Sequence, residues 1–279
     1  MQKYKQFIFS CFLATNTVAT IFLFNNSAVA QVGISPIVIK SQASRGQSES
    51  VINLLNPSKV PIRVRIFSQP FTYSKDGQFQ TLSSSKQDLS SYLQFSPREL
   101  SLEPGESRKV RLLAQLNPNL PDGEYRAVVF AESLIENANN QGSGIGVIAR
   151  VATTVYVTKG NQVPNLTVGD ASFNPKQNQL RLLVLNLGTA TARPVVSWQL
   201  KQGTTVVRKG TIQPSTVIAS SERNLMIELG ATDTQPLPSG NYELIGELTW
   251  MHLAQPKTTT FKLPVNITQP ISQSVGVQK

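Results

Sequence analysis

Short runs of alternating apolar and polar residues, separated by turn sequences, dominate the chain after residue 31 and constrain its fold most strongly. Side chains of a β-strand point alternately to opposite faces, so this alternation predicts strands with one buried face. No stretch of ten residues in this part has the apolar stripe of an amphipathic helix. The sequence therefore predicts an all-β chain with strands at residues 34–39, 50–55, 62–67, 108–113, 127–132, 147–157, 179–185, 195–200, 224–229, 242–250 and 258–265.

The first thirty residues have the features of a secretory signal peptide. Lys3 and Lys5 form a basic start, residues 7–24 are mostly apolar, and Ala28-Val29-Ala30 is a small-x-small cleavage sequence. Several polar residues dilute the apolar run, so we expect cleavage after this sequence rather than a retained membrane anchor. The sequence thus predicts export, with no stable membrane insertion after cleavage.

The two halves of the exported part repeat one another weakly and in the same order. The clearest repeated motif is Leu-Pro-x-Gly-x-Tyr, which ends at Tyr125 and again at Tyr242. A Tyr at a strand start directly after a tight turn is typical of the tyrosine corner of immunoglobulin-like domains. We expect two tandem immunoglobulin-like β-sandwich domains, with the chain divided into a signal peptide at 1–30, domains at 31–159 and 160–270, and a disordered tail at 271–279.

The residue types that most enzymes and metal sites use are scarce. His252 is the one histidine, and the one cysteine, Cys11, lies in the predicted signal peptide. Acidic residues, Asp122 and Glu124 among them, stand at scattered spacing and are predicted to be solvated loop residues rather than an acid/base pair. The sequence therefore predicts a protein that is not an enzyme and has no cofactor and no metal site.

The chain has a formal net charge of +10, and its basic residues are scattered. It contains no run of five or six like charges, and aromatic residues do not alternate with basic ones, which argues against a nucleic-acid partner. The charge instead predicts a solvated basic surface that meets anionic polymers or acidic partners weakly.

Residues 144–159 form the longest alternating run and follow a polar loop at 137–142. Its length predicts a strand along a sheet edge, whose unpaired N–H and C=O groups can add a strand from a partner. The apolar side chains predicted to bind this partner strand all lie on one face; they are Ile145, Val147, Ala149 and Val151. The alternative, that the alternation only fills the core of the same domain, stays open at this point.

The first half of the exported part resembles the PapD-like periplasmic pilus chaperones, a family with two immunoglobulin-like domains. The matching stretches are residues 33–39, 51–58, 95–111 and 120–126, whereas the second half matches only in general pattern. The resemblance implies a periplasmic chaperone that donates an edge strand to an exported, pilin-like β-rich subunit. It also raises an outer-membrane usher as a further partner.

The resemblance further implies an anchor for the carboxylate at the end of the client chain, made by an Arg of the opening strand and a Lys of the last strand of the first domain. These positions fall on Ile37 and Thr154, and neither residue is basic. Lys40 and Arg150 are the basic residues nearest to them that could supply charge-assisted hydrogen bonds. These four residues are therefore the candidates for a cleft anchor.

A second hypothesis is a structural or adhesive immunoglobulin-like envelope protein that binds anionic surface polymers through its basic surface. It predicts salt-sensitive binding to anionic glycans and no stoichiometric protein client. The chaperone hypothesis predicts instead a one-to-one complex with a subunit that lacks a strand.

Overall fold

The structure, a computed structural model, describes residues 32–134, 148–229, 237–252 and 254–268. The predicted signal peptide and C-terminal tail lie outside the described residues. Within them the chain forms β-strands and one short 3-10 helix, Ser90–Tyr92, and no α-helix. The prediction of an all-β chain is confirmed. Among these residues no helix is long and apolar enough to cross a membrane.

The first sandwich packs a sheet of order β1-β3-β9-β7 against a sheet of order β2-β11-β10-β4-β8. Buried and exposed residues alternate along its strands; in β4, for example, Val64 is buried between the exposed Arg63 and Arg65. The strands are β1 (Gly33–Ser35), β2 (Val38–Gln42), β3 (Gln47–Leu55), β4 (Ile62–Gln69), β7 (Leu93–Ser96), β8 (Glu99–Leu102), β9 (Ser107–Gln115), β10 (Gly123–Leu134) and β11 (Arg150–Lys159).

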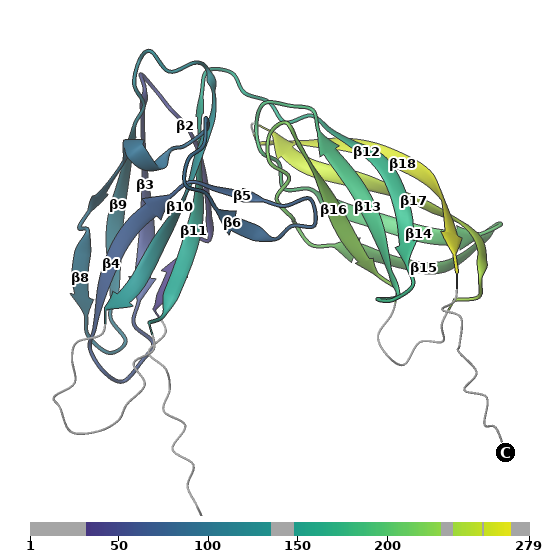
Figure 1. The fold of residues 1–279 in the computed structure, drawn as a ribbon, viewed down its shortest axis with the longest axis horizontal. Coiled ribbons are helices and arrows are strands. Elements are labelled where there is room, and N and C mark those ends of the chain that lie inside the picture. Colours follow the sequence, from purple (N-terminus) through teal and green to yellow (C-terminus); the bar gives the residue numbers. More distant parts are fainter. Residues whose placement is uncertain (1–31, 135–147, 230–236, 253, 269–279) are drawn as a thin grey trace, which may run out of the picture.

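The second sandwich packs a sheet of order β12-β13-β16 against a sheet of order β15-β14-β17-β18. Figure 1 shows the two sandwiches joined end to end at an angle. The strands are β12 (Leu166–Asn174), β13 (Gln179–Asn186), β14 (Val195–Gln202), β15 (Thr205–Ile212), β16 (Ser221–Glu228), β17 (Gly240–His252) and β18 (Gln255–Ile267). Each sandwich has its own apolar core.

A hairpin of β5 (Phe71–Tyr73) and β6 (Phe79–Thr81) leaves the first sandwich and reaches the second (Figure 1). The sequence pattern did not predict this hairpin, because strands of three residues are too short to show a period of two. The predicted strands also leave out β7, β8, β12 and β15, and the strand predicted at 34–39 is divided between β1 and β2. Strand β12 has an irregular register between Val168 and Ala171, which interrupts the alternation.

Equivalent polar contacts recur in the two sandwiches. The Tyr125 hydroxyl donates to the carbonyl of Pro121 (2.7 Å), and the Tyr242 hydroxyl donates to that of Pro238 (2.8 Å). These bonds have the geometry of tyrosine corners, in which the ring packs in the core and the hydroxyl holds the preceding turn.

Two buried asparagines repeat one another in the same way. The Asn56 side-chain amide donates to the carbonyls of Val60 and Leu102, at 2.8 and 3.0 Å. The Asn186 amide donates to those of Ala190 and Val217, at 2.9 and 3.1 Å. Each asparagine directly follows a leucine, Leu55 or Leu185, at the end of a strand, so the repeat of the two halves extends to this contact.

Candidate functional site

The outer edge of β11 is covered along only part of its length. Strand β10 pairs with β11 from Arg150 to Lys159, whereas the parallel strand β2 pairs with it only from Thr154 to Thr158. In the described part of the chain, no strand pairs with the other side of β11 between Arg150 and Thr153. This free half-edge, residues 150–153, is the candidate functional site.

The direction of the peptide groups follows from two recorded bonds. The Ser133 N–H donates to the Ala149 carbonyl at 2.9 Å, so the peptide groups of Ala149 face β10. The Thr154 N–H donates to the Ile37 carbonyl at 3.0 Å, so those of Thr154 face the opposite edge. Peptide groups alternate in direction along a strand, and the N–H and C=O groups of Arg150 and Ala152 therefore point to the free half-edge.

The pairing of β2 with β11 does not extend back to Pro36. The Thr153 hydroxyl donates to the Pro36 carbonyl at 2.6 Å, and Pro36 itself has no N–H to donate to a neighbouring strand. Ile37 is 64% exposed beside this point. Pairing with β11 therefore begins only at Val38, which leaves residues 150–153 open.

The four residues predicted to bind a partner strand differ in their surroundings. Ile145 and Val147 lie outside the described residues. Ala149 is half-buried beside Ser133, whose hydroxyl accepts a bond from the Ala149 N–H at 2.9 Å. The side chain of Val151 packs against the core of the first sandwich. The free peptide groups thus belong to Arg150 and Ala152, whose side chains lie on the opposite face from Val151.

That opposite face carries a charged row across three strands. Glu132 of β10 is paired with Arg65 of β4 on one side and with Arg150 of β11 on the other. Arg65 donates to Glu132 at 2.7 Å, and Arg150 donates to it through Nε at 2.8 Å and through Nη2. The hydrogen bonds from Arg150 hold the pKa of Glu132 below its usual range, with those from Arg65 adding to the effect. The candidate anchor Arg150 is therefore already paired within the chain.

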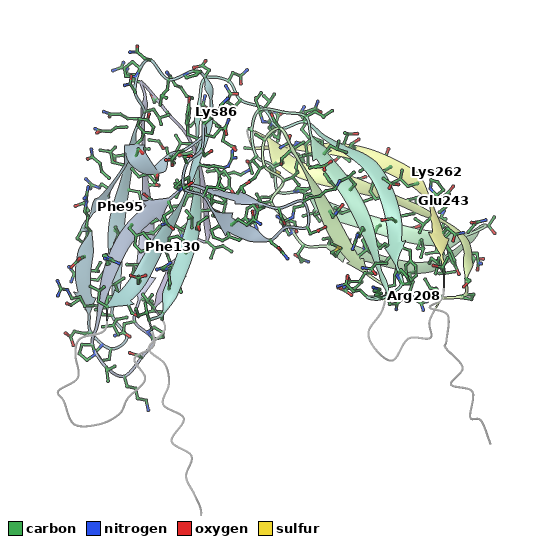
Figure 2. All side chains as sticks on the ribbon, in the orientation of Figure 1. Lys86, Phe95, Phe130, Arg208, Glu243 and Lys262 are labelled. Atoms are coloured by element: carbon green, nitrogen blue, oxygen red, sulfur yellow. The ribbon has the colours of Figure 1, made fainter. Side chains whose placement is uncertain are left out.

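The next row on this face is aromatic. Phe130 of β10 pairs with Phe67 of β4 and with Ala152 of β11. The two rings lie 5.3 Å apart, and the Arg150 guanidinium lies 5.3 Å from the Phe67 ring centre and 5.2 Å from that of Phe130. Figure 2 labels Phe130 on the first sandwich. The half-edge is thus bordered by cation–π contacts.

The cleft between the sandwiches holds the other anchor candidate, Lys40. Its Nζ donates to the Thr191 carbonyl of the second sandwich. Thr191 in turn donates to the Glu124 carboxylate through its N–H, at 2.6 Å, and through its hydroxyl. His252 also lines this cleft, which has a volume of about 360 Å³. The cation of the cleft is thus paired with the protein's own groups.

Burial opposes the charge on both cleft groups. It raises the pKa of the Glu124 carboxyl, although the bonds from Thr191 and the nearby Lys40 oppose the rise. It lowers the pKa of the Lys40 amine, although Glu124 opposes the fall. Glu124 is only 5% exposed and lies in β10, so its prediction as a solvated loop residue is wrong. Its position between a turn and a strand start gave no sign that the second sandwich covers it.

Neither of the other anchor candidates carries a charge in the cleft. The Thr154 N–H and hydroxyl both donate to the Ile37 carbonyl, at 3.0 and 3.5 Å. These two residues therefore close the start of the β2–β11 pairing. Their place in the structure is at the boundary between the covered part of β11 and the free half-edge.

The hairpin β5–β6 makes a second connection between the sandwiches. The Asn224 N–H donates to the Lys75 carbonyl at 2.7 Å, and its side chain donates to Asp76 at 2.7 Å. The Arg223 guanidinium lies 5.1 Å from the centre of the Tyr73 ring. A salt bridge of 2.7 Å joins Lys75 to Glu222. The hairpin tip is therefore bound to β16 by several directional contacts.

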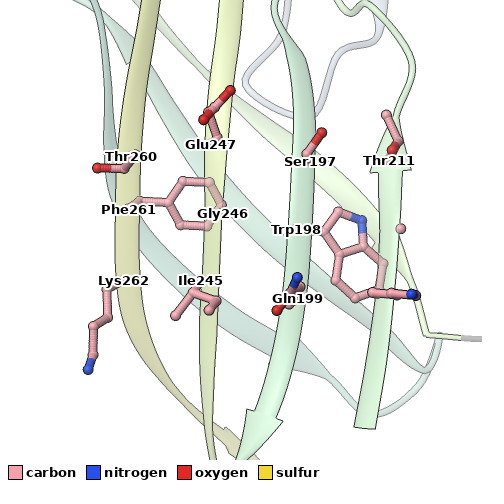
Figure 3. Close-up of a pocket in the computed structure, with 12 residues that line it drawn as sticks. Ser197, Trp198, Gln199, Thr211, Ile245, Gly246, Glu247, Thr260, Phe261 and Lys262 are labelled. Carbon is pink, nitrogen blue, oxygen red and sulfur yellow. The ribbon is translucent and has the colours of Figure 1, made fainter. Parts of the chain in front are cut away.

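A further hollow, of about 1020 Å³, lies over the sheet β15-β14-β17-β18 of the second sandwich. Figure 3 shows side chains such as Gln199, Glu247 and Lys262 around it. The residues that line it include one carboxylate, Glu247, and no histidine. In the described residues no group of three His, Cys, Asp or Glu side chains could hold a metal ion.

The fold and the half-edge together define a class: a protein of two β-sandwiches set at an angle, with an incompletely covered strand on the first. Solved structures with a similar two-sandwich fold include fimbrial chaperones. The YadV chaperone matches with a TM-score of 0.50 at 11% identity, over 84% of this chain and 100% of that one. The prediction of two tandem immunoglobulin-like sandwiches is confirmed, and the resemblance to this family is confirmed at the level of the fold.

Two other solved structures have lower scores. The class 5 fimbriae chaperone CfaA has a TM-score of 0.49 at 14% identity, covering 84% of this chain and 99% of its own. The SafB chaperone in complex with SafA pilin, from Salmonella enterica, has a TM-score of 0.45 at 11% identity, covering 85% and 97%. No protein-family model matches the chain, and no curated protein matches it significantly.

Proposed function

We propose that this protein is a chaperone that holds exported β-rich subunits by strand addition at residues 150–153. The observation that carries the proposal is the half-covered strand β11, in which Arg150 and Ala152 direct peptide groups to an open edge while β2 covers the rest. A subunit that lacks one strand of its sandwich exposes the matching row of peptide groups, and β11 can complete it. The proposed role is binding and involves no chemical step.

The proposed place of action is the periplasm. The signal-peptide sequence at residues 1–30 supports export, and the chaperone fold shared with YadV supports a client that is itself exported, such as a pilus or surface-fibre subunit. An outer-membrane usher, the further partner that the family resemblance raised, stays part of this proposal.

Main-chain bonds alone would hold a client weakly. Arg150 and Ala152 each offer one N–H and one C=O, and a hydrogen bond contributes about 0.5–1.5 kcal/mol net. Association itself costs about 4–15 kcal/mol. Lys40 is bonded to Thr191, and Arg150 already bonds Glu132 through Nε and Nη2, so neither residue forms a full anchor for a terminal carboxylate that makes up the difference. Side-chain contacts of the client must therefore supply the rest of the affinity.

Hydrogen exchange with a synthetic strand tests the proposal. The probe is a nine-residue peptide of alternating valine and threonine, added to the purified protein. We expect the amide protons of Arg150 and Ala152 to exchange fast in the free protein and slowly with the peptide, whereas that of Thr154 is slow in both. Protection that appears only at another sheet edge, or nowhere, would overturn the proposal.

Two proline variants give a matched pair. Ala152→Pro removes an N–H that points to the open edge, and it should abolish peptide binding with little change in stability. Val151→Pro removes an N–H that points to β10, and it should destabilise the sandwich strongly. Peptide binding that survives Ala152→Pro would contradict strand addition at this edge. Salt-sensitive retention on an anionic polymer with no peptide binding would instead favour an adhesive protein.

A further inference from the structure

The face of the first sandwich beside the free half-edge carries two rows of side chains in register, and both rows end at the edge. The charged row runs Arg65, Glu132, Arg150 from β4 through β10 to β11. The aromatic row, one pair further along, runs Phe67, Phe130, Ala152. The last members of the rows, Arg150 and Ala152, are the residues whose peptide groups point to the open edge.

The charged row has a net positive charge and ends in a cation at the edge. It contains two cations and one carboxylate, and Glu132 is buried with a side-chain exposure of 7%. Arg65 and Arg150 are about half exposed, at 50% and 49%. The bonds of Arg150 to Glu132 use Nε and Nη2, and within the described part of the chain no hydrogen bond of its Nη1 is recorded. An alternating row of plus, minus, plus would be continued by a negative group.

The side chains of the aromatic row become smaller toward the edge. Phe130 is 7% exposed and packs with Phe67 and Ala152 in a small cluster on this outer face. Ala152 is the smallest member and stands at the edge, so the height of the apolar surface falls from ring to methyl group. A large apolar side chain on a neighbouring strand would lie over Ala152 and reach the flank of Phe130.

We propose that these two rows select the strand that is added, favouring an acidic residue beside Arg150 and a large aliphatic or aromatic residue beside Ala152. The two selected residues are two positions apart in the client strand, because alternate residues share a face. The inference rests on the proposed strand addition and names the side chains that give it specificity. The client chemistry is thus an acidic and apolar pair on the solvent face of a β-strand.

Fluorescently labelled peptides test the selection on the purified protein. They share a backbone of alternating valine and threonine and carry, two positions apart, glutamate or lysine combined with leucine or serine. Each pair is made in both orders, because parallel and antiparallel strands meet Arg150 and Ala152 in opposite order. We expect each favourable choice to tighten binding about fivefold, the upper range for a cross-strand pair.

Variants separate the two rows. Arg150→Gln should remove the preference for glutamate over lysine and keep that for leucine, whereas Ala152→Leu should remove the preference for leucine over serine. Arg63→Gln is the matched control, since Arg63 lies on the same sheet at β4 and is paired with Glu99 at 2.8 Å. It should change neither preference.

The outcomes distinguish this inference from the proposed function. Peptides that all bind equally well, with protection at Arg150 and Ala152, would overturn the selection and leave strand addition standing. Peptides of which none binds would overturn strand addition and the selection with it. An unchanged preference for glutamate in Arg150→Gln would also refute the charged row as its cause.

Discussion

Glu124 of the first sandwich accepts two hydrogen bonds from Thr191 of the second, one from its N–H and one from its hydroxyl. Lys40 donates to the carbonyl of the same threonine. A buried carboxylate needs such partners, because leaving it unpaired would cost several kcal/mol. These bonds therefore favour one angle between the two sandwiches, and the hairpin β5–β6 adds a second point of attachment.

The pH dependence of stability should reveal the burial of Glu124. A folded-state pKa above the ordinary 4.5 means that the folded protein binds the proton more tightly than the unfolded chain. The contribution of Glu124 is therefore full below about pH 4.5 and falls as the pH rises through its folded pKa. We expect the free energy of unfolding of the wild type, relative to Glu124→Gln, to decrease over this range in urea titrations.

Glu132 provides a control of opposite sign. Its pKa is lowered in the folded state, so its contribution is present above the ordinary pKa and is lost as the pH falls through the folded value. The stability of the wild type relative to Glu132→Gln should therefore increase with pH. Two slopes of the same sign would show that one of the two environments is wrongly described.

Loss of the hairpin contacts should loosen the angle between the sandwiches. Asp76→Ala removes the bond from Asn224 of β16, and Arg223→Ala removes the contact of β16 with Tyr73 of the hairpin. The chain after its predicted signal peptide has no cysteine, so spin labels can be attached at Ser101→Cys and Thr260→Cys. We expect a broader distance distribution in the double variant, and no change in the exposed control Lys176→Ala. An unchanged distribution would mean that the hairpin does not fix the angle.

The paired asparagines should matter equally to their own sandwiches. Asn56→Ala and Asn186→Ala each remove the two hydrogen bonds that the side-chain amide donates and the two that its oxygen accepts. We expect each to cost about 2–4 kcal/mol in urea-induced unfolding. Asn266→Ala, at an exposed asparagine bonded to Asn241, should cost less than about 0.5 kcal/mol. A small loss at one of the buried sites would break the structural equivalence of the two halves.

Gly246 should tolerate no side chain. A Cβ there would lie 2.3 Å from the Ser197 carbonyl oxygen and 2.6 Å from the Phe261 ring. Because a backbone atom cannot move aside cheaply, Gly246→Ala should cost about 1–3 kcal/mol in thermal or urea unfolding. Gly123→Ala is the control, since a Cβ there would meet nothing within 4 Å. Equal stabilities of the two variants would contradict the close approach of β17 to β14.

Sequence patterns predicted the architecture because sandwich cores depend on alternation and turn chemistry. Tyr125 and Tyr242 could be placed from a six-residue motif, since the contacts of a tyrosine corner are local. Contacts between the sandwiches are not local, so the sequence around Glu124 did not distinguish it from an exposed acidic residue beside a turn. The short hairpin β5–β6 was not predicted, because its strands of three residues are too short to show a period of two and its contacts with β16 are not local.

The candidate site was predicted in part. The run at residues 144–159 pointed to the strand, but alternation in a sequence describes side chains and does not show which peptide groups are paired. That depends on where β2 begins, and so on Pro36 and on the bond between Thr154 and Ile37. The rows that end at Arg150 and Ala152 depend on register with β4 and β10, which a single sequence does not specify.

Under the proposed strand addition, the partial covering of β11 also determines which contacts break when a client is released. Strand β2 pairs with β11 from Thr154 onward, so the protein keeps its own hydrogen bonds whether or not a client strand occupies residues 150–153. When a client strand leaves, only its own contacts with the protein break, and the first sandwich stays folded. Under the same proposal, another strand can therefore displace β11 from the client one peptide pair at a time, beginning at the open end near Arg150.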